Sequence, residues 1–292
     1  MFITSVHDLD VQTKTVGVEM WLWSISKDKR RPLDTTEFPN ANAVSRSLGS
    51  DLRRAEGHWS QVKIAGTFRQ NWDLRNFPFD RQTVVVDVEE AESDITKLAY
   101  DVDRRDSSYL RQIRLDGWNI TGFSVQPVAE RYQTTFGDPE LPSGSGSTYA
   151  RMTATLHIER DQITTFFKLT SGLYVAVIIS LISFFLAAEN PSLMSARVSL
   201  VVAALFAAVL NMRSAQDATG QVTGASLLDK LHILGLLFIA AATVMAIVSR
   251  LRVERGDDPA VVQRASVRTF MVALPAYVVL NLLLVEVAVH SG

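Results

Sequence analysis

Six residues between positions 195 and 213 have the types and spacing of a path for ions. The six are Ser195, Ser199, Ala203, Phe206, Leu210 and Arg213. Their intervals of 4, 4, 3, 4 and 3 residues place them on one face of an α-helix. If five copies surrounded an axis, the serine hydroxyls would replace water around an ion, and the apolar rings of Phe206 and Leu210 would gate by dewetting. The same spacing fits a helix buried in a four-helix bundle, so spacing alone leaves both interpretations open.

Charged residues near the two ends of this stripe bear on ion selectivity. Five like side chains add their fields in a pore of low dielectric constant. Arg213 and Arg197 favour anions, whereas Asp217 and Glu189 would form acidic rings that favour cations. We expect anion selectivity from this balance, and cation selectivity stays open as the alternative.

The composition excludes several classes of site. The chain has 292 residues and no cysteine, so disulfides and thiolate zinc sites are impossible. A formal net charge of -2 leaves no basic excess for a phosphate backbone, and nucleic acid is not an expected partner. The sequence has no nucleophile elbow, phosphate-binding glycine loop or paired-histidine motif. We therefore expect no enzyme, no cofactor and no metal site.

Two other features have titratable groups in unusual positions. Acidic residues crowd one segment, at Asp87, Glu89, Glu90, Glu92 and Asp94. Clustered carboxylates can bind a divalent cation or sense protons, because each raises the pKa of its neighbours, but we expect solvated loop charges here. His232 lies inside an apolar stretch, where a titratable group either is functional or has a polar partner.

The elements that must position these residues differ between the two halves of the chain. Up to Ile163 the sequence has 20 Lys and Arg and 24 Asp and Glu, whereas the remaining 129 residues have 9 and 7. Residues 1–163 therefore predict a water-exposed domain, and residues 164–292 predict a transmembrane domain. Uncharged stretches near the ~20 residues that span a bilayer predict helices at about 165–188, 194–216, 226–250 and 266–290.

The segment between the third and fourth predicted helices indicates the orientation. From Arg250 to Arg268 it has five arginines against three acidic residues, and cytoplasmic segments carry the Lys and Arg excess. We expect a short cytoplasmic loop at 251–265, with residues 1–163 on the extracytoplasmic side of the plasma (inner) membrane. The first residues begin neither a basic region nor a long apolar one, so we expect that this chain carries no signal peptide.

The first domain has the pattern of short strands. Residues 15–25, 61–68, 83–89, 118–125 and 150–158 are rich in Val, Ile, Thr and aromatic residues and alternate apolar with polar positions. Strands at this spacing predict an immunoglobulin-like β-sandwich, and the whole chain is expected to be an α+β membrane protein. Residues 137–147, rich in Gly, Pro and Ser, predict a mobile loop between two strands.

One motif connects the two halves to a known family. Residues 66–82 contain Phe77-Pro78-Phe79-Asp80 followed by Gln82, and this segment resembles the Cys-loop signature of pentameric ligand-gated ion channels. The two cysteines of that loop would match Gln70 and Val84, and their absence is similar to the bacterial branch of the family. Further pieces follow in the order of the family, at 6–10, 21–23, 38–40, 160, 196–200 and 228–230. The chain departs from the family pattern at Ser26, where a tryptophan is usual, and in a first helix without proline.

The resemblance implies a homopentamer in membrane lipid that passes small inorganic ions through a pore lined by the second helix. It implies gating residues where the sandwich meets the membrane, at Asp10, Phe77, Pro78, Phe79, Asp80 and Arg160. It also implies a small-molecule site between subunits that uses aromatic side chains, at Phe38, Trp59, Tyr132 and Phe136. An amine would bind there by cation–π attraction, and protons are the other agonist to consider. The alternative function is a non-conducting membrane receptor whose helices only anchor a ligand-binding β-sandwich.

Overall fold

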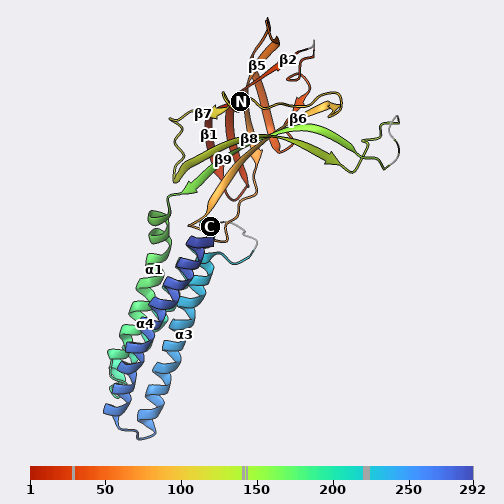
Figure 1. The fold of residues 1–292 in the computed structure, drawn as a ribbon. Helices are drawn as coiled ribbons and strands as arrows, with labels where there is room; N and C mark the ends of the chain where they lie inside the picture. The colour runs from red at the N-terminus through yellow and green to blue at the C-terminus, as the bar shows by residue number, and fades with distance from the viewer. Residues whose placement is uncertain (28–29, 140–141, 143, 220–223, 292) are drawn as a thin grey trace. The chain divides into compact units, whose positions relative to one another are not determined.

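The structure is a computed structural model that describes residues 1–27, 30–139, 142, 144–219 and 224–291. Parts of the predicted loop at 137–147 and of the link at 217–224 lie outside the described residues. The chain forms two compact units, each described here by itself (Figure 1). The sheet unit comprises Met1–Trp72 and Arg81–Glu159, and the helical unit comprises Asp73–Asp80 and Arg160–Gly292. The predicted boundary lay after residue 163, whereas here the segment 73–80 groups with the helices.

The sheet unit consists of two sheets. Its strands are β1 (Phe2–Asp10), β2 (Thr15–Ser26), β3 (Thr36–Glu37), β4 (Ala41–Arg54), β5 (Gly57–Arg69), β6 (Arg81–Asp94), β7 (Ser108–Tyr109), β8 (Trp118–Tyr132) and β9 (Ser147–Arg160). One sheet has the order β4-β5-β2-β1-β7 and the other the order β3-β6-β9-β8. All five predicted strands are confirmed, because each lies within an observed strand.

Alternating side chains of both sheets make the core of this unit. In β2 the side chains of Val16, Val18 and Met20 are buried, and in β6 those of Val84 and Val86 are buried. Period-two burial is expected of strands that cover a core on one face, and β-branched residues fit such strands well. β4 lacks this pattern: it is mostly exposed and lies at the edge of its sheet, where pairing with β5 maintains it.

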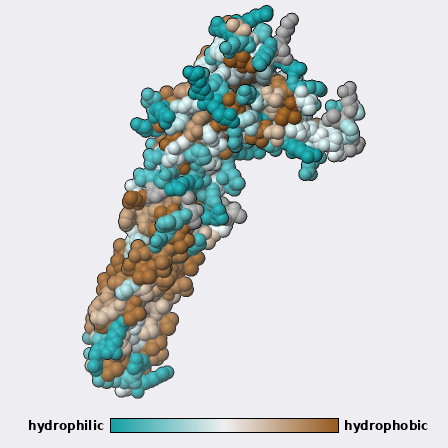
Figure 2. Space-filling view, viewed as in Figure 1, coloured by the Kyte–Doolittle hydropathy of each residue, from teal (hydrophilic) through white to brown (hydrophobic). Residues whose placement is uncertain are grey.

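Among its described residues, the helical unit has four long helices. They are α1 (Gln162–Ile182), continued by the 3₁₀ turn η1 (Ser183–Phe185), α2 (Pro191–Thr219), α3 (Leu227–Glu254) and α4 (Pro259–Ser291). Each is long and apolar enough to cross a membrane, and apolar side chains cover most of the visible helix surface in Figure 2. The chain is therefore a multi-pass membrane protein, in which the described residues form a β domain and four helices able to cross the membrane.

The link between α3 and α4 is shorter than the loop predicted at 251–265. α3 continues to Glu254, where Arg250 forms an i,i+4 ion pair with Glu254 at 2.8 Å. α4 begins at Pro259, a residue favoured at the first helical position. The carboxylate of Asp258 accepts a hydrogen bond from the backbone N–H of Ala260 at 2.9 Å. The last turn of α3 and the first turns of α4 thus contain polar residues outside the apolar stretches.

Helices α1 and α3 approach each other closely at Gly235. A Cβ atom at this position would lie 2.5 Å from Cδ1 of Leu173 and 3.4 Å from Cγ2 of Val177. Both of these α1 side chains are fully buried. Small residues at such crossings allow close van der Waals packing, which is a main source of stability between helices in lipid.

We predict that Gly235→Val destabilises the helical unit, because the added side chain overlaps Leu173. Overpacking of this kind costs about 1–3 kcal/mol. The measurement is denaturant unfolding of the purified chain in mild detergent. Ala241→Val, at an exposed position of the same helix, is the control. Equal stability of the two variants would contradict the close α1–α3 packing.

Candidate functional site

The six predicted pore residues lie on the exposed side of α2. Between residues 191 and 218 of α2, the buried positions are Met194, Arg197, Val201, Ala204, Ala208 and Ala215. At 100° per residue, the stripe from Ser195 to Arg213 lies on the opposite side of the helix. All six of its residues are exposed in the single chain, with Phe206 at 67% and Leu210 at 65%. The stripe is therefore not packed inside the bundle of its own chain, and its place in a pore stays a prediction.

Arg197 differs from the position expected for it at the end of the stripe. Its side chain is fully buried, and its guanidinium carbon lies 4.8 Å from the centre of the Phe184 ring. Within the described part of the chain, Nε, Nη1 and Nη2 have no hydrogen-bond acceptor. Arg197 therefore does not share a face with Ser195 and Ser199. Of the two arginines that favoured anions, Arg213 alone belongs to the exposed stripe.

His232 has polar partners inside the bundle. Its Nδ1 donates to the carbonyl oxygen of Leu228 at 2.7 Å, and its Nε2 lies 3.0 Å from Oδ1 of Asn211. The ring is fully buried and connects α3 with α2. This arrangement gives the intramembrane histidine a packing role between two helices.

Asp80 and Arg160 form a buried ion pair where β6 begins and β9 ends. β6 begins at Arg81, which pairs with Glu159 of β9, so Asp80 and Arg160 are opposite each other one residue further along. Nε of Arg160 lies 2.8 Å from Oδ1 of Asp80, and Nη2 lies 3.2 Å from Oδ2. The side chains are 1% and 12% exposed, respectively. This two-point geometry is the strong form of an arginine–carboxylate bond.

The segment 73–80 holds this pair against the helices. The guanidinium carbon of Arg160 lies 4.6 Å from the centre of the Phe77 ring. Phe79 packs against Phe166 of α1 with ring centres 5.4 Å apart, and Pro78 stands between the two phenylalanines. The carbonyl oxygen of Arg75 accepts a hydrogen bond from the backbone N–H of Leu227, the first residue of α3, at 3.0 Å. Five of the six predicted gating residues thus lie together in the helical unit.

Asp10, the sixth predicted gating residue, belongs to the sheet unit. Its carboxylate accepts the backbone N–H groups of Gln12 at 2.7 Å and Thr13 at 3.0 Å. The hydrogen bond from Thr13 lowers the pKa of Asp10 below its ordinary value. The indole N–H of Trp72 donates to the backbone oxygen of Asp10 at 3.1 Å. Asp10 therefore shapes the turn between β1 and β2.

The four predicted ligand residues divide into a pair and two separate residues. The ring centres of Tyr132 and Phe136 lie 5.3 Å apart, and the ring centre of Tyr149 lies 6.0 Å from each of them. Phe38 packs instead in an edge-to-face arrangement with Phe68, with ring centres 6.1 Å apart. Trp59 on β5 lies beneath the guanidinium group of Arg54 at 5.8 Å. The structure supports an aromatic cluster of Tyr132, Phe136 and Tyr149, without Phe38 and Trp59.

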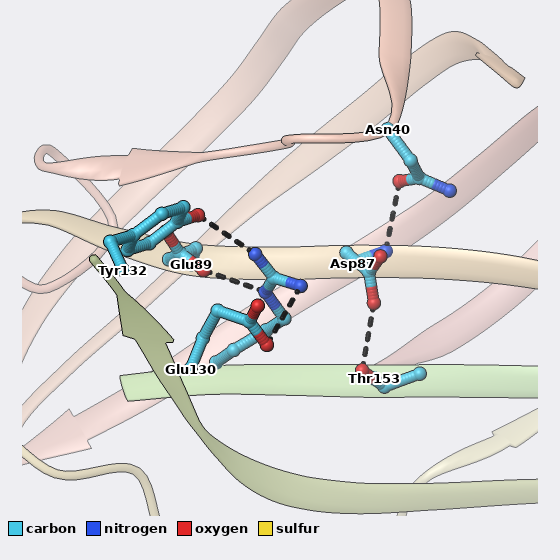
Figure 3. Close-up of polar contacts among 7 residues, drawn as sticks. Asn40, Asp87, Glu89, Glu130, Tyr132 and Thr153 are labelled. Carbon is cyan, nitrogen blue, oxygen red and sulfur yellow. Dashed lines mark hydrogen bonds and ion pairs between the residues drawn. The ribbon is translucent and has the colours of Figure 1, made fainter. Parts of the chain in front are cut away.

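A charged network includes Tyr132 of this aromatic cluster (Figure 3). Glu89 and Arg151 are cross-strand partners in β6 and β9, joined by an ion pair of 2.6 Å, and Glu89 is 2% exposed. Glu130 lies 3.2 Å from the same guanidinium group. The Tyr132 hydroxyl donates to Glu89 at 2.7 Å and accepts from Arg151 at 2.9 Å. Burial, together with the hydrogen bond and charge of Glu89, raises the pKa of Tyr132 to about 12, so the hydroxyl keeps its proton.

Sequence reasoning missed the network of Glu89, Glu130 and Arg151, because it depends on the pairing of strands far apart in the sequence: the register of β6 with β9 joins Glu89 to Arg151, and β8 beside β9 adds Glu130. It also predicted that the acidic run would be solvated, and this is wrong for Glu89 and Glu90, which are buried, whereas Asp87 is half-buried. Asp87 accepts from the Thr153 hydroxyl at 2.7 Å (Figure 3), and Glu89 belongs to the network. Glu90 is buried and accepts the Thr35 hydroxyl at 2.7 Å. Among the described residues, no group of three or more His, Cys, Asp or Glu side chains is placed to hold a metal ion.

We predict that Asp80 and Arg160 are energetically coupled. Removing one partner leaves a buried charge uncompensated, so Asp80→Asn and Arg160→Met should each cost about 3 kcal/mol or more. The double variant should lose less stability than the sum of the single variants. Unfolding in detergent measures all three. The exposed pair Asp73 and Arg75 is the control, for which we expect additive effects. Additive effects at Asp80 and Arg160 would show that the pair contributes no coupling.

Comparison with known proteins adds no family assignment to this geometry. No protein-family model matches the chain, and no curated protein matches it. The function is therefore argued from the residues and contacts described above.

Proposed function

We propose that this chain is one subunit of a homopentameric ion channel of the plasma membrane, with α2 of each subunit lining the pore. The observation that carries this proposal is the exposed stripe on α2. Hydroxyl and guanidinium groups on a membrane-spanning helix are costly against lipid and favour water or a protein neighbour. A water-filled axis surrounded by α2 helices satisfies Ser195, Ser199 and Arg213 together. The number five comes from the resemblance of residues 66–82 to the Cys-loop signature.

The order of residues along the stripe supports roles in conduction and gating. Phe206 and Leu210 form apolar rings that close the pore by dewetting. Arg213 forms a cationic ring at one mouth and favours anions. Ions pass down their gradient when a ligand that binds the open state more tightly shifts the equilibrium toward it.

The path of the chain supports coupling between ligand binding and the pore. The chain passes between the two units at residues 72–73, 80–81 and 159–160. The segment 73–80 contacts the first turns of α1 and α3, and Asp80 fixes it to Arg160. A change in the ends of β6 and β9 would therefore reach the helices through covalent bonds and one ion pair.

The aromatic cluster supports an amine as the ligand. Tyr132, Phe136 and Tyr149 present ring faces and edges close to a network with two carboxylates and one guanidinium group. The network has an excess of one negative charge, and aromatic faces attract desolvated cations. Phe136 is largely exposed and is available to a ligand.

The first test is the symmetry of the purified particle, followed by its current. Electron microscopy of the chain in mild detergent should give five-fold end-on views. Two-fold particles or monomers would contradict the channel and favour a receptor anchored by its helices.

In planar bilayers, Arg213→Glu should shift the reversal potential toward that of cations, because it reverses the charge of one pore ring. Arg255→Glu, in the α3–α4 link, is the matched control, and an unchanged reversal potential in Arg213→Glu would remove Arg213 from the pore.

We predict that Phe136→Ala weakens activation by amines. Loss of one cation–π partner is worth about 0.5–2 kcal/mol, which corresponds to an increase of roughly 2- to 30-fold in the half-maximal concentration. The measurement is bilayer current with a panel of primary and quaternary amines. Phe38→Ala, at the aromatic residue that packs on Phe68, is the control. Equal effects of the two variants would exclude the cluster as the amine site.

A further inference from the structure

The sheet unit has a cavity of about 590 Å³ near the end of β2. Its walls come from residues 22–26 at the end of β2 and Lys27 after it, from Arg30, Pro32 and Leu33 before β3, and from residues 97–103 after β6. This volume lies within the range of small-molecule sites in proteins. It is separate from the aromatic cluster, because Tyr132, Phe136 and Tyr149 do not line it.

The cavity has an apolar floor with two aromatic side chains. Leu22, Val88 and Val102 line it and are buried. Trp23 and Tyr100 also line it and add flat apolar surface. The accessible lining as a whole is polar and apolar in about equal parts, so it fits a small ligand that has both apolar surface and a polar group.

The polar groups of the wall are held in fixed positions. The indole N–H of Trp23 donates to Oδ2 of Asp103 at 3.2 Å, and the backbone N–H of Asp106 donates to Oδ1 at 3.1 Å. Both oxygens of Asp103 are therefore engaged within the protein. The Tyr100 hydroxyl lies 3.5 Å from Oγ1 of Thr36, and burial raises the pKa of Tyr100 to about 12. This hydroxyl keeps its proton and can donate a hydrogen bond to an acceptor in the cavity.

Charged side chains around the cavity favour a negative group. Lys27, Arg30 and Lys97 line it, against the carboxylates of Asp101 and Asp103. Arg30 donates to the backbone oxygen of Lys97 at 2.5 Å, which joins the segment before β3 to the segment after β6. These three cationic side chains against two carboxylates leave an excess of one positive charge among the side chains that line the cavity.

We propose that this cavity binds a small molecule with an apolar or aromatic body and one carboxylate group. The body lies against Leu22, Trp23 and Val88, and the carboxylate lies near Lys27 and Lys97. Charge-assisted hydrogen bonds from these ammonium groups select the carboxylate. The proposal goes beyond channel activity and does not depend on it, since it concerns binding to the sheet unit alone.

The test uses the full chain in lipid nanodiscs and the probe 3-(3-bromophenyl)propionate. Bromine quenches the fluorescence of a nearby indole, so the probe should quench Trp23, and Trp23→Phe should remove the saturable part of the quenching. The neutral amide of the same acid should bind at least about tenfold more weakly, because it lacks the charge that the lysines select. Lys27→Gln and Lys97→Gln should each weaken binding by about two- to fivefold, as expected for partly exposed charge pairs.

Matched variants separate binding from folding. Lys63→Gln alters a lysine paired with Glu19 at 2.8 Å that does not line the cavity, and it should leave binding unchanged. Ala99→Phe adds bulk to the cavity wall without removing a buried group, and it should abolish the quenching while the thermal midpoint stays at that of the unmodified chain. Equal binding of the acid and the amide would overturn the proposal. So would quenching that persists in Trp23→Phe or in Ala99→Phe.

Discussion

The ion pair between Asp80 and Arg160 determines how this chain passes from strands to helices. β6 begins beside the end of β9, and the residue before β6 and the last residue of β9 carry opposite charges in a place with little water. A lone charge there would be costly, so the pair is stable only while both partners remain. Because Asp80 ends the segment 73–80 and Arg160 ends β9 two residues before α1, the same bond fixes the position of both. Phe77 covers the guanidinium group and limits access of water.

The helical unit uses polar side chains to satisfy backbone groups that lipid cannot. Gln263 of α4 donates to the carbonyl oxygens of Phe184 at 3.2 Å and Phe185 at 3.3 Å, where α1 ends in a 3₁₀ turn. Arg250 of α3 donates to the carbonyl oxygen of Ala188 at 3.3 Å. In an environment without water, each open carbonyl needs such a donor. The end of α1 is therefore tied to α3 and α4.

The sequence predicts the elements better than it predicts their contacts. Valine-rich alternation identifies the strands, and uncharged stretches identify the helices, because burial in a sheet or in lipid acts on each segment separately. The sequence does not predict β4, because this strand is polar and depends on pairing with its neighbour β5. The sequence also does not predict which side of α2 is buried. Arg197 lies on that side and faces Phe184 rather than the stripe. Glu89 and Arg151 are 62 residues apart in the sequence. Their pairing requires the register of β6 with β9, which no local pattern specifies.

The short segment 73–80 has a consequence for dividing this protein into fragments. It lies between two strands of the sheet unit in sequence, yet its side chains pack with the helices. A fragment that ends at Glu159 would keep the segment and lose Arg160 and Phe166. Phe77 and Phe79 would then face water, and Asp80 would have lost its cation. A soluble sheet fragment therefore requires a polar turn in place of 73–80, because cutting the chain at one point does not separate the two units.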